Sequence, residues 1–181
     1  MRLFVAVDVS DEIREKIFNL SRFFNFRGAK AVEKDNIHIT LKFIGEVDNR
    51  KKDIIVEKLN EIEFESFTVR FKGIGFFPSA SKMRVVWAGV EDPGEMRRLA
   101  EMVEDKLSEA GIKKERRFLA HATIARIKRI DGKMRSELIK KLEPHMKDDF
   151  GEMRVESFAL KKSTLTPKGP IYDDVQVFKL K

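Results

Sequence analysis

The chain of 181 residues is 42% hydrophobic and carries 37 Lys and Arg against 30 Asp and Glu, a net charge of +7. It can bury a core as one domain or two fused lobes, and the charge excess suits a polyanionic partner without establishing one. The lack of cysteine excludes disulfide scaffolds, thiolate metal sites and cysteine nucleophiles. No apolar run has the length of a signal peptide or a membrane span, so we expect a cytoplasmic protein.

In chain order, the first half alternates strand and helix patterns. The apolar run at 2–9 predicts a buried strand, and an apolar period of three to four after it predicts a helix. The strand pattern "NIHITLKFIG" follows at 36–45 and contains His38, one of only three histidines. A second helical pattern runs from Ile54 to Ile62, and an alternating strand follows at 67–77.

The second half repeats this order. A strand at 84–91 is followed by a helical pattern from Met96 to Leu107. The strand "FLAHATIARI" at 118–127 places His121 83 residues after His38 (121 − 38). The half closes with a helical pattern at 134–142 and strands at 153–162 and 175–180.

The recurring order predicts an internal duplication. We expect one domain over residues 1–181, made of two lobes related by an approximate twofold axis, with repeat halves at about 1–90 and 84–181. The expected fold class is α+β, with two antiparallel sheets facing each other across a central cleft and helices packed on the outside. Equivalent strands of the two lobes would meet at that cleft.

Both histidines open the same pattern, His-x-Thr-x. Because alternate side chains of a strand share a face, His38, Thr40 and Lys42 should point one way. His121 and Thr123 should share a face in the same manner, so each strand offers an imidazole and a hydroxyl about 7 Å apart. Two facing imidazoles suit acid and base catalysis, and in a wet, basic cleft each should have a pKa within one or two units of about 6.5.

Two other interpretations compete with catalysis. A single histidine on a strand is more often a half-exposed residue with one hydrogen bond, but its recurrence at equivalent repeat positions favours a function. Metal binding is disfavoured, because each strand offers one nitrogen donor, no carboxylate stands beside either motif, and threonine is a poor zinc ligand. We therefore expect no metal and no cofactor. His145, among charges after Pro144, is interpreted as a solvated surface residue.

The chain resembles the two-histidine phosphoesterases along nearly its whole length. Its motifs are similar to those of the RNA 2′,3′-cyclic phosphodiesterases, which were historically named 2′-5′ RNA ligases. The matching segments are "RLFVAV", "NIHITLKFIGEV", "FFPSASKMRVVWAGV", "FLAHATIARI" and "STLTPKGPIY". Two positions depart from the family pattern: Ala120 stands where relatives often carry Pro, and Ala31 where many carry Trp.

The resemblance implies hydrolysis of RNA 2′,3′-cyclic phosphate ends to 2′-phosphomonoesters without a metal ion. His121 would be the proton acceptor that activates water, and His38 the proton donor to the 3′ oxygen. The symmetry of the two motifs alone does not choose between these roles. The hydroxyls of Thr40 and Thr123 are assigned to the charge that develops on the phosphoryl oxygens.

The family also implies that Arg126 is a phosphate ligand. Strict alternation opposes this, because an offset of five residues (126 − 121) puts it on the face opposite His121, and a bulge or the strand end would have to turn it back. Lys42 is a further candidate for phosphate binding, with a solvated lysine as the alternative. Phe118 and Tyr172 are candidates to stack a terminal base, with a role at the edge of the core as the alternative.

The expected partner is RNA with a 2′,3′-cyclic phosphate end, ends derived from tRNA included, bound by a monomer without membrane contact. Reverse joining to a 5′-hydroxyl would use the same transition state. Two alternatives stay open: a non-catalytic RNA-binding module whose histidines only bind phosphate, and a two-histidine phosphoesterase that acts on a small cyclic nucleotide. ATP use is not supported, because "GIGFF" lacks the spacing and the lysine of a phosphate-binding loop.

Overall fold

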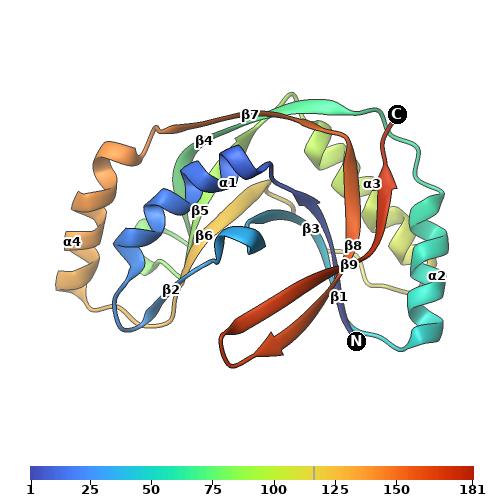
Figure 1. The fold of residues 1–181 in the computed structure, drawn as a ribbon, viewed down its shortest axis with the longest axis horizontal. Coiled ribbons are helices and arrows are strands. Elements are labelled where there is room, and N and C mark those ends of the chain that lie inside the picture. The colour runs from blue at the N-terminus through green and yellow to red at the C-terminus, as the bar shows by residue number, and fades with distance from the viewer. Residues whose placement is uncertain (116) are drawn as a thin grey trace.

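The computed structural model describes residues 1–115 and 117–181 (Figure 1). Its α-helices are α1 (Asp11–Phe18), α2 (Asn49–Asn60), α3 (Glu95–Glu109) and α4 (Gly132–Leu142). Its strands are β1 (Arg2–Asp8), β2 (Ala29–Ala31), β3 (His38–Glu46), β4 (Phe67–Phe77), β5 (Val85–Glu91), β6 (His121–Ile127), β7 (Asp149–Val155), β8 (Ser157–Thr166) and β9 (Gly169–Lys179). Within these described ranges, no helix is both long and apolar enough to cross a membrane.

The described strands form one nine-stranded sheet in which every pair is antiparallel. Its order is β7-β4-β5-β6-β3-β1-β8-β9, and β2 pairs with β6 outside this path. The two halves of the sheet meet between β3 and β6, where Ile39 pairs with Ala122. The expected α+β class is confirmed. The sequence predicted two separate sheets. The pairing of β3 with β6 joins them into the two halves of one sheet.

The half-sheets do not follow the chain order of the two sequence halves. β4, from the first half of the chain, pairs with β5 and β7. β8, from the second half, pairs with β1. Each half-sheet therefore contains strands from both parts of the chain, which ties the two parts together. The division into one domain with repeat halves at about 1–90 and 84–181 remains a prediction.

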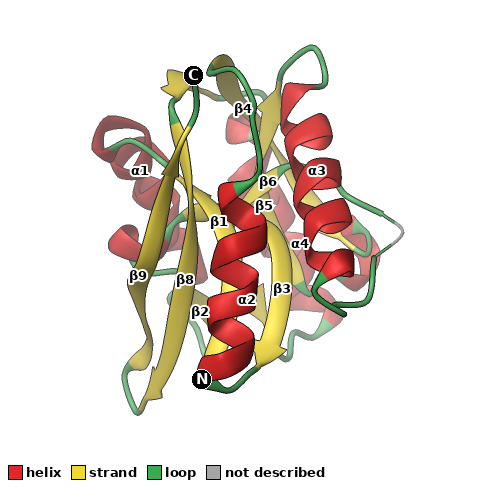
Figure 2. Cartoon of the chain, turned by 90° about the vertical axis from the view of Figure 1, so that its right-hand side faces the viewer, coloured by secondary structure: helices red, strands yellow, loops and turns green. Residues whose placement is uncertain are grey.

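The four helices named above form two pairs, one at each end of the molecule. In Figure 1, α1 and α4 lie at one end of the molecule and α2 and α3 at the other. Figure 2 shows α2 and α3 side by side next to β3. Each helix turns an apolar stripe inward, as Ile13 and Ile17 do in α1 and Leu99 and Val103 do in α3, all buried.

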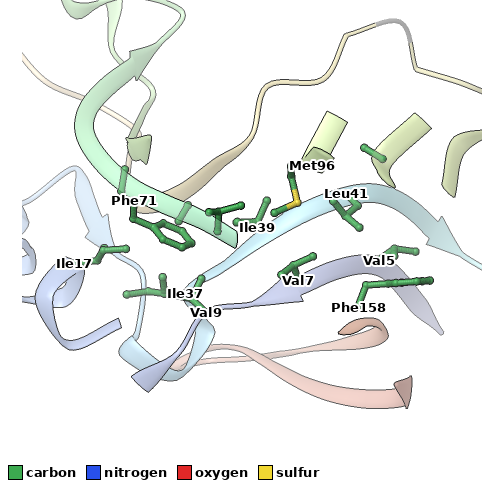
Figure 3. Close-up of a cluster of buried hydrophobic side chains, with 14 of the residues drawn as sticks. Val5, Val7, Val9, Ile17, Ile37, Ile39, Leu41, Phe71, Met96 and Phe158 are labelled. Atoms are coloured by element: carbon green, nitrogen blue, oxygen red, sulfur yellow. The ribbon is translucent and has the colours of Figure 1, made fainter. Parts of the chain in front are cut away.

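Part of the hydrophobic core lies around β1 and β3. Val5 and Val7 of β1 pack near Ile39 and Leu41 of β3, with Met96 of α3 close by (Figure 3). All five side chains are at most 4% exposed. Full burial of such a side chain contributes roughly 1.5 to 3 kcal/mol. The strand that carries His38 is therefore held on its apolar face by a rigid core.

Candidate active site

The candidate site is built on the two strands where the half-sheets meet, β3 and β6. Ile39 and Ala122 face each other in the antiparallel register and are fully buried. Because side chains alternate along a strand, the residues on either side of this pair emerge on the opposite face of the sheet. The antiparallel register also sets each histidine across from the threonine of the other strand. These four residues are His38, Thr40, His121 and Thr123.

The four side chains line a single cavity of about 520 Å³, so the structure brings together both predicted His-x-Thr pairs. Arg126 and Tyr172 line the same cavity. Phe118, the other aromatic candidate, lines a smaller neighbouring cavity instead. The site thus collects residues from β3, β6 and the β8–β9 hairpin, whose turn extends beyond the other strands in Figure 1. The catalytic and binding roles of these residues remain predictions.

Aromatic rings pack beside both imidazoles. The ring of His38 lies 5.2 Å from that of Phe4 and 5.4 Å from that of Tyr172, centroid to centroid. The ring of His121 lies 5.0 Å from that of Phe77 and 6.1 Å from that of Trp87. Such contacts hold the imidazole planes and remove water from their faces.

A bulge in β6 brings Arg126 into the cavity. Val86 of β5 pairs with Ala125, but the next residue, Trp87, pairs with Thr123, so one residue of β6 is extra. The extra residue reverses the alternation and turns Arg126 to the side of Thr123. The face predicted by strict alternation is therefore wrong for Arg126, and the bulge that the family pattern required is present.

A bulge at the equivalent place in β3 takes Lys42 out of the cavity. Val5 pairs with Lys42 and Ala6 with Thr40, which leaves Leu41 extra. Lys42 then turns away from the cavity and is only 2% exposed. The expectation that Lys42 shares the face of His38 is wrong for this reason.

Phe43 takes the place in the cavity that strict alternation gave to Lys42. It lines the cavity and is 59% exposed. Sequence reasoning missed it. A signal existed in the repeat, because Phe43 follows His38 by the same five residues (43 − 38) as Arg126 follows His121.

Hydrogen bonds fix the same ring orientation in both histidines. Nδ1 of His38 donates to the carbonyl oxygen of Asn36 at 2.6 Å, and Nδ1 of His121 donates to that of Leu119 at 2.7 Å. A carbonyl oxygen can only accept, so Nδ1 carries the proton and Nε2 is the nitrogen left to accept or donate. Nε2 of His38 lies 2.8 Å from the hydroxyl oxygen of Thr40, which donates to it when the ring is neutral.

Comparison with known proteins identifies the family. The model described as LigT like Phosphoesterase matches residues 7–87 and 89–172. The chain belongs to the LigT-like phosphoesterase family. The resemblance noted from the sequence motifs is thereby confirmed.

Named relatives span nearly the whole chain. The RNA 2′,3′-cyclic phosphodiesterase of Archaeoglobus fulgidus is 47% identical, covering 98% of this chain and 99% of the relative. That of Methanocaldococcus jannaschii is 40% identical, with coverages of 97% and 99%. Among solved structures, Escherichia coli LigT complexed with 3′-AMP superposes with a TM-score of 0.81 at 25% identity, covering 99% of this chain and 98% of that chain. The protein TT0787 of Thermus thermophilus gives a TM-score of 0.80 at 32% identity, with coverages of 99% and 97%.

Burial shifts the titration of both imidazoles in this LigT-like phosphoesterase. It lowers the pKa of His38 from 6.5 to about 4, and the charge of Lys161 adds to this shift. Burial also lowers the pKa of His121; the bond to Leu119 opposes the shift and the charge of Arg126 adds to it. The expectation of a pKa within one or two units of 6.5 is wrong for His38, because aromatic rings stand where water was expected.

The pKa of His38 predicts a loss of stability in acid. The unfolded chain binds this proton near pH 6.5 and the folded protein only near pH 4, so protonation between these values favours unfolding. The contribution is complete above pH 6.5 and falls by up to about 2 to 3 kcal/mol toward pH 4. Urea unfolding at pH 7.5 and 4.5 should show a smaller loss in His38→Gln than in wild type.

His145→Gln is the matched control for this measurement. His145 is half-buried, lies outside the large cavity and bonds to Asp148 at 2.7 Å, which corrects its interpretation as a solvated residue. Equal losses in wild type and His38→Gln would mean that His38 keeps its ordinary pKa in the folded protein.

Three lysines complete the lining of the cavity. Lys30 of β2 pairs in register with Arg126, and Lys168 stands at the turn between β8 and β9. Lys128, the residue after the end of β6, lines the cavity too. All three are exposed, and none makes an ion pair with a carboxylate among residues 1–115 and 117–181. Their charges are therefore free to attract an anion.

Proposed function

We propose that this protein hydrolyses 2′,3′-cyclic phosphate ends of RNA to 2′-phosphomonoesters. One observation carries the proposal: two imidazoles, each with Nδ1 tied to a carbonyl oxygen, share one cavity with two threonines and an arginine. A site that only binds phosphate needs lysine and arginine, whereas two neutral imidazoles suit proton transfer. The relatives named RNA 2′,3′-cyclic phosphodiesterase support the same reaction.

His121 is proposed as the base and His38 as the acid. Nε2 of His121 accepts a proton from water as the water oxygen attacks phosphorus. The bond from phosphorus to the 3′ oxygen breaks, and Nε2–H of His38 gives that oxygen its proton, which leaves a 2′-phosphate and a 3′-hydroxyl. The bond between His38 and Thr40 keeps the acid directed along β3, while Nε2 of His121 has no hydrogen-bond partner among the described residues and is open to water.

The negative charge of the substrate favours the protonated form of His38 that the acid role requires. With a pKa near 4, His38 of the free protein is neutral at pH 7. A bound cyclic phosphate carries one negative charge, which favours the imidazolium form and raises the pKa of His38. Protonation of the acid is thus coupled to occupancy of the site.

The negative charge of the reacting phosphate is met by donors already in place. The hydroxyls of Thr40 and Thr123 stand beside the two imidazoles, and Arg126 adds a guanidinium. These groups stabilise the equatorial oxygens in the transition state. The same transition state serves the reverse reaction, in which a 5′-hydroxyl replaces water and a 2′-5′ linkage forms.

The unpaired lysines of the cavity suit the rest of an RNA strand. Lys30, Lys128 and Lys168 would contact backbone phosphates without reading sequence. The rings of Phe43 and Tyr172 offer apolar surface to a terminal base. Ends derived from tRNA fall within this substrate class.

One chain supplies every residue of the proposed site, which supports a monomer as the active unit. The cytoplasmic location remains a prediction from the sequence.

The test uses an RNA oligonucleotide that ends in a 2′,3′-cyclic phosphate, with the product identified by phosphorus NMR. We expect a 2′-phosphomonoester, in EDTA as in its absence, and a higher kcat/KM than for a cyclic mononucleotide. Binding without turnover would support the RNA-binding module, and preference for the mononucleotide would support the small-nucleotide enzyme. Loss of turnover in EDTA with recovery on adding zinc would refute the metal-free mechanism.

A further inference from the structure

Lys42 is the most deeply buried charged side chain of the described residues, with 2% of its surface exposed. The bulge of β3 directs it toward α3, which lies next to β3 (Figure 2). An unpaired ammonium group at this depth would be strongly unfavourable, so its partners have to account for its presence.

Three partners surround the ammonium group. Nζ lies 3.1 Å from Oε1 of Glu104 on α3 and 3.8 Å from Oε1 of Glu115. It also donates to the carbonyl oxygen of Lys113 at 2.7 Å. The other carboxylate oxygen of Glu104 accepts from the backbone N–H of Glu115 at 3.2 Å. Lys42 and Glu104 therefore hold the chain at two nearby points just after α3 ends.

The chain held in this way leads into the active site. Six residues after Lys113 (119 − 113), the carbonyl oxygen of Leu119 accepts from Nδ1 of His121. The side chain of Leu119 is 51% exposed. A cavity of about 190 Å³ lies between Leu119 and Lys42, and His121 also lines it. Packing thus holds the side chain of Leu119 weakly, and the contacts of Lys42 and Glu104 fix the chain at residues 113 and 115, which precede it.

The equivalent position in β6 shows that the fold does not require a lysine here. Ala125 stands 83 residues after Lys42 (125 − 42), at the same bulge, and is fully buried. The first half-sheet holds its own carbonyl differently: the side chain of Asn36, the residue that bonds His38, donates to the carbonyl oxygen of Pro170 at 2.9 Å. For His38 a side-chain contact holds the residue two positions before it, whereas before His121 the contacts of Lys42 and Glu104 hold residues 113 and 115.

We propose that Lys42 is a positioning residue for His121. It holds residues 113 and 115, between α3 and β6, so that the Leu119 carbonyl keeps the proton on Nδ1 and Nε2 faces the cavity. Lys42 touches no reacting atom in this arrangement. The catalytic use of the geometry rests on the proposed function, whereas the geometry can be tested without it.

The test compares Lys42→Met, which keeps an unbranched side chain one atom shorter and removes its charge, with Lys42→Arg, which keeps the charge. Long-range proton–nitrogen NMR of His121 should show the Nδ1-protonated tautomer in wild type and in Lys42→Arg. In Lys42→Met we expect a mixture of tautomers and a lower pKa of His121, because the Leu119 bond raises that pKa. A displaced catalytic group should lower kcat about 10-fold, with KM within about threefold.

Lys58→Met is the matched control. Lys58 pairs with Glu109 of α3 at 3.2 Å and with Glu61 at 3.4 Å, away from the connection to β6. Its loss should leave the tautomer of His121 and kcat unchanged within about twofold.

The outcomes separate the proposals. An unchanged tautomer and unchanged kcat in folded Lys42→Met would overturn the role of Lys42. If Lys42→Met does not fold, Lys42→Met/Glu104→Gln, which removes both buried charges, is measured by the same criteria; failure of this variant to fold as well would show a purely structural role and also overturn it. A wild-type protein that hydrolyses no cyclic phosphate would refute the proposed function while the tautomer measurement still decides the role of Lys42.

Discussion

Replacing His38 or His121 with Ala is expected to lower kcat for a cyclic phosphate about 10²- to 10⁴-fold, the usual loss for a general acid or base. Each imidazole presents Nε2 to the same cavity, and alanine leaves nothing there to transfer a proton. Steady-state kinetics on the RNA substrate provides the measurement. The double variant should lose less than the product of the two single losses, because acid and base act on one transition state.

The pH dependence of the wild type checks the same pair. One imidazole must be neutral and the other charged, so kcat/KM should follow a bell-shaped curve whose limbs report the pair. Burial lowers the pKa of both histidines in the free protein, and a bound anion raises it. The limbs of kcat should therefore lie at higher pH than those of kcat/KM. His145→Ala, outside the cavity, should retain full activity, and near-normal turnover of the double variant would show that the histidines are not the acid and the base.

Replacing Arg126 with Ala is expected to lower kcat/KM, because the transition state loses about 1 to 3 kcal/mol of stabilisation, the range for a lost charge-assisted hydrogen bond. This corresponds to roughly 5- to 150-fold. The guanidinium also lowers the pKa of His121, so its removal should raise that pKa and shift the pH profile to higher pH. Kinetics at several pH values measures both effects.

Two variants make the result for Arg126 specific. Arg126→Lys keeps the charge without the planar donor set and should recover part of the loss. Arg154→Ala on β7 removes an exposed arginine that bonds Ser66 and Thr68, far along the sheet order from β6, and should leave kcat/KM unchanged. Kinetics of Arg126→Ala equal to those of wild type would exclude Arg126 as a phosphate ligand.

The sequence by itself determined the class of fold and the centre of the site. Strand and helix patterns depend on the local period of apolar residues, so the order of the main elements was readable residue by residue. The pairing of His38 with Thr40 and of His121 with Thr123 depends only on alternation within two or three residues, which no distant contact altered. The repeat of the motif and the family resemblance then indicated that both pairs meet.

Only the tertiary structure decided the features that depend on pairing between distant segments. The extra residues in β3 and β6 exist only relative to β1 and β5, and they send Lys42 to α3 and Arg126 into the cavity. The exchange of β4 and β8 between half-sheets likewise depends on which distant strands pair. The pKa of His38 depends on burial beside Phe4 and Tyr172, which are far from it in sequence and close only after folding. A local pattern contains no information about which distant strand or ring will be its neighbour, and that neighbour sets both the direction of these side chains and the solvent around them.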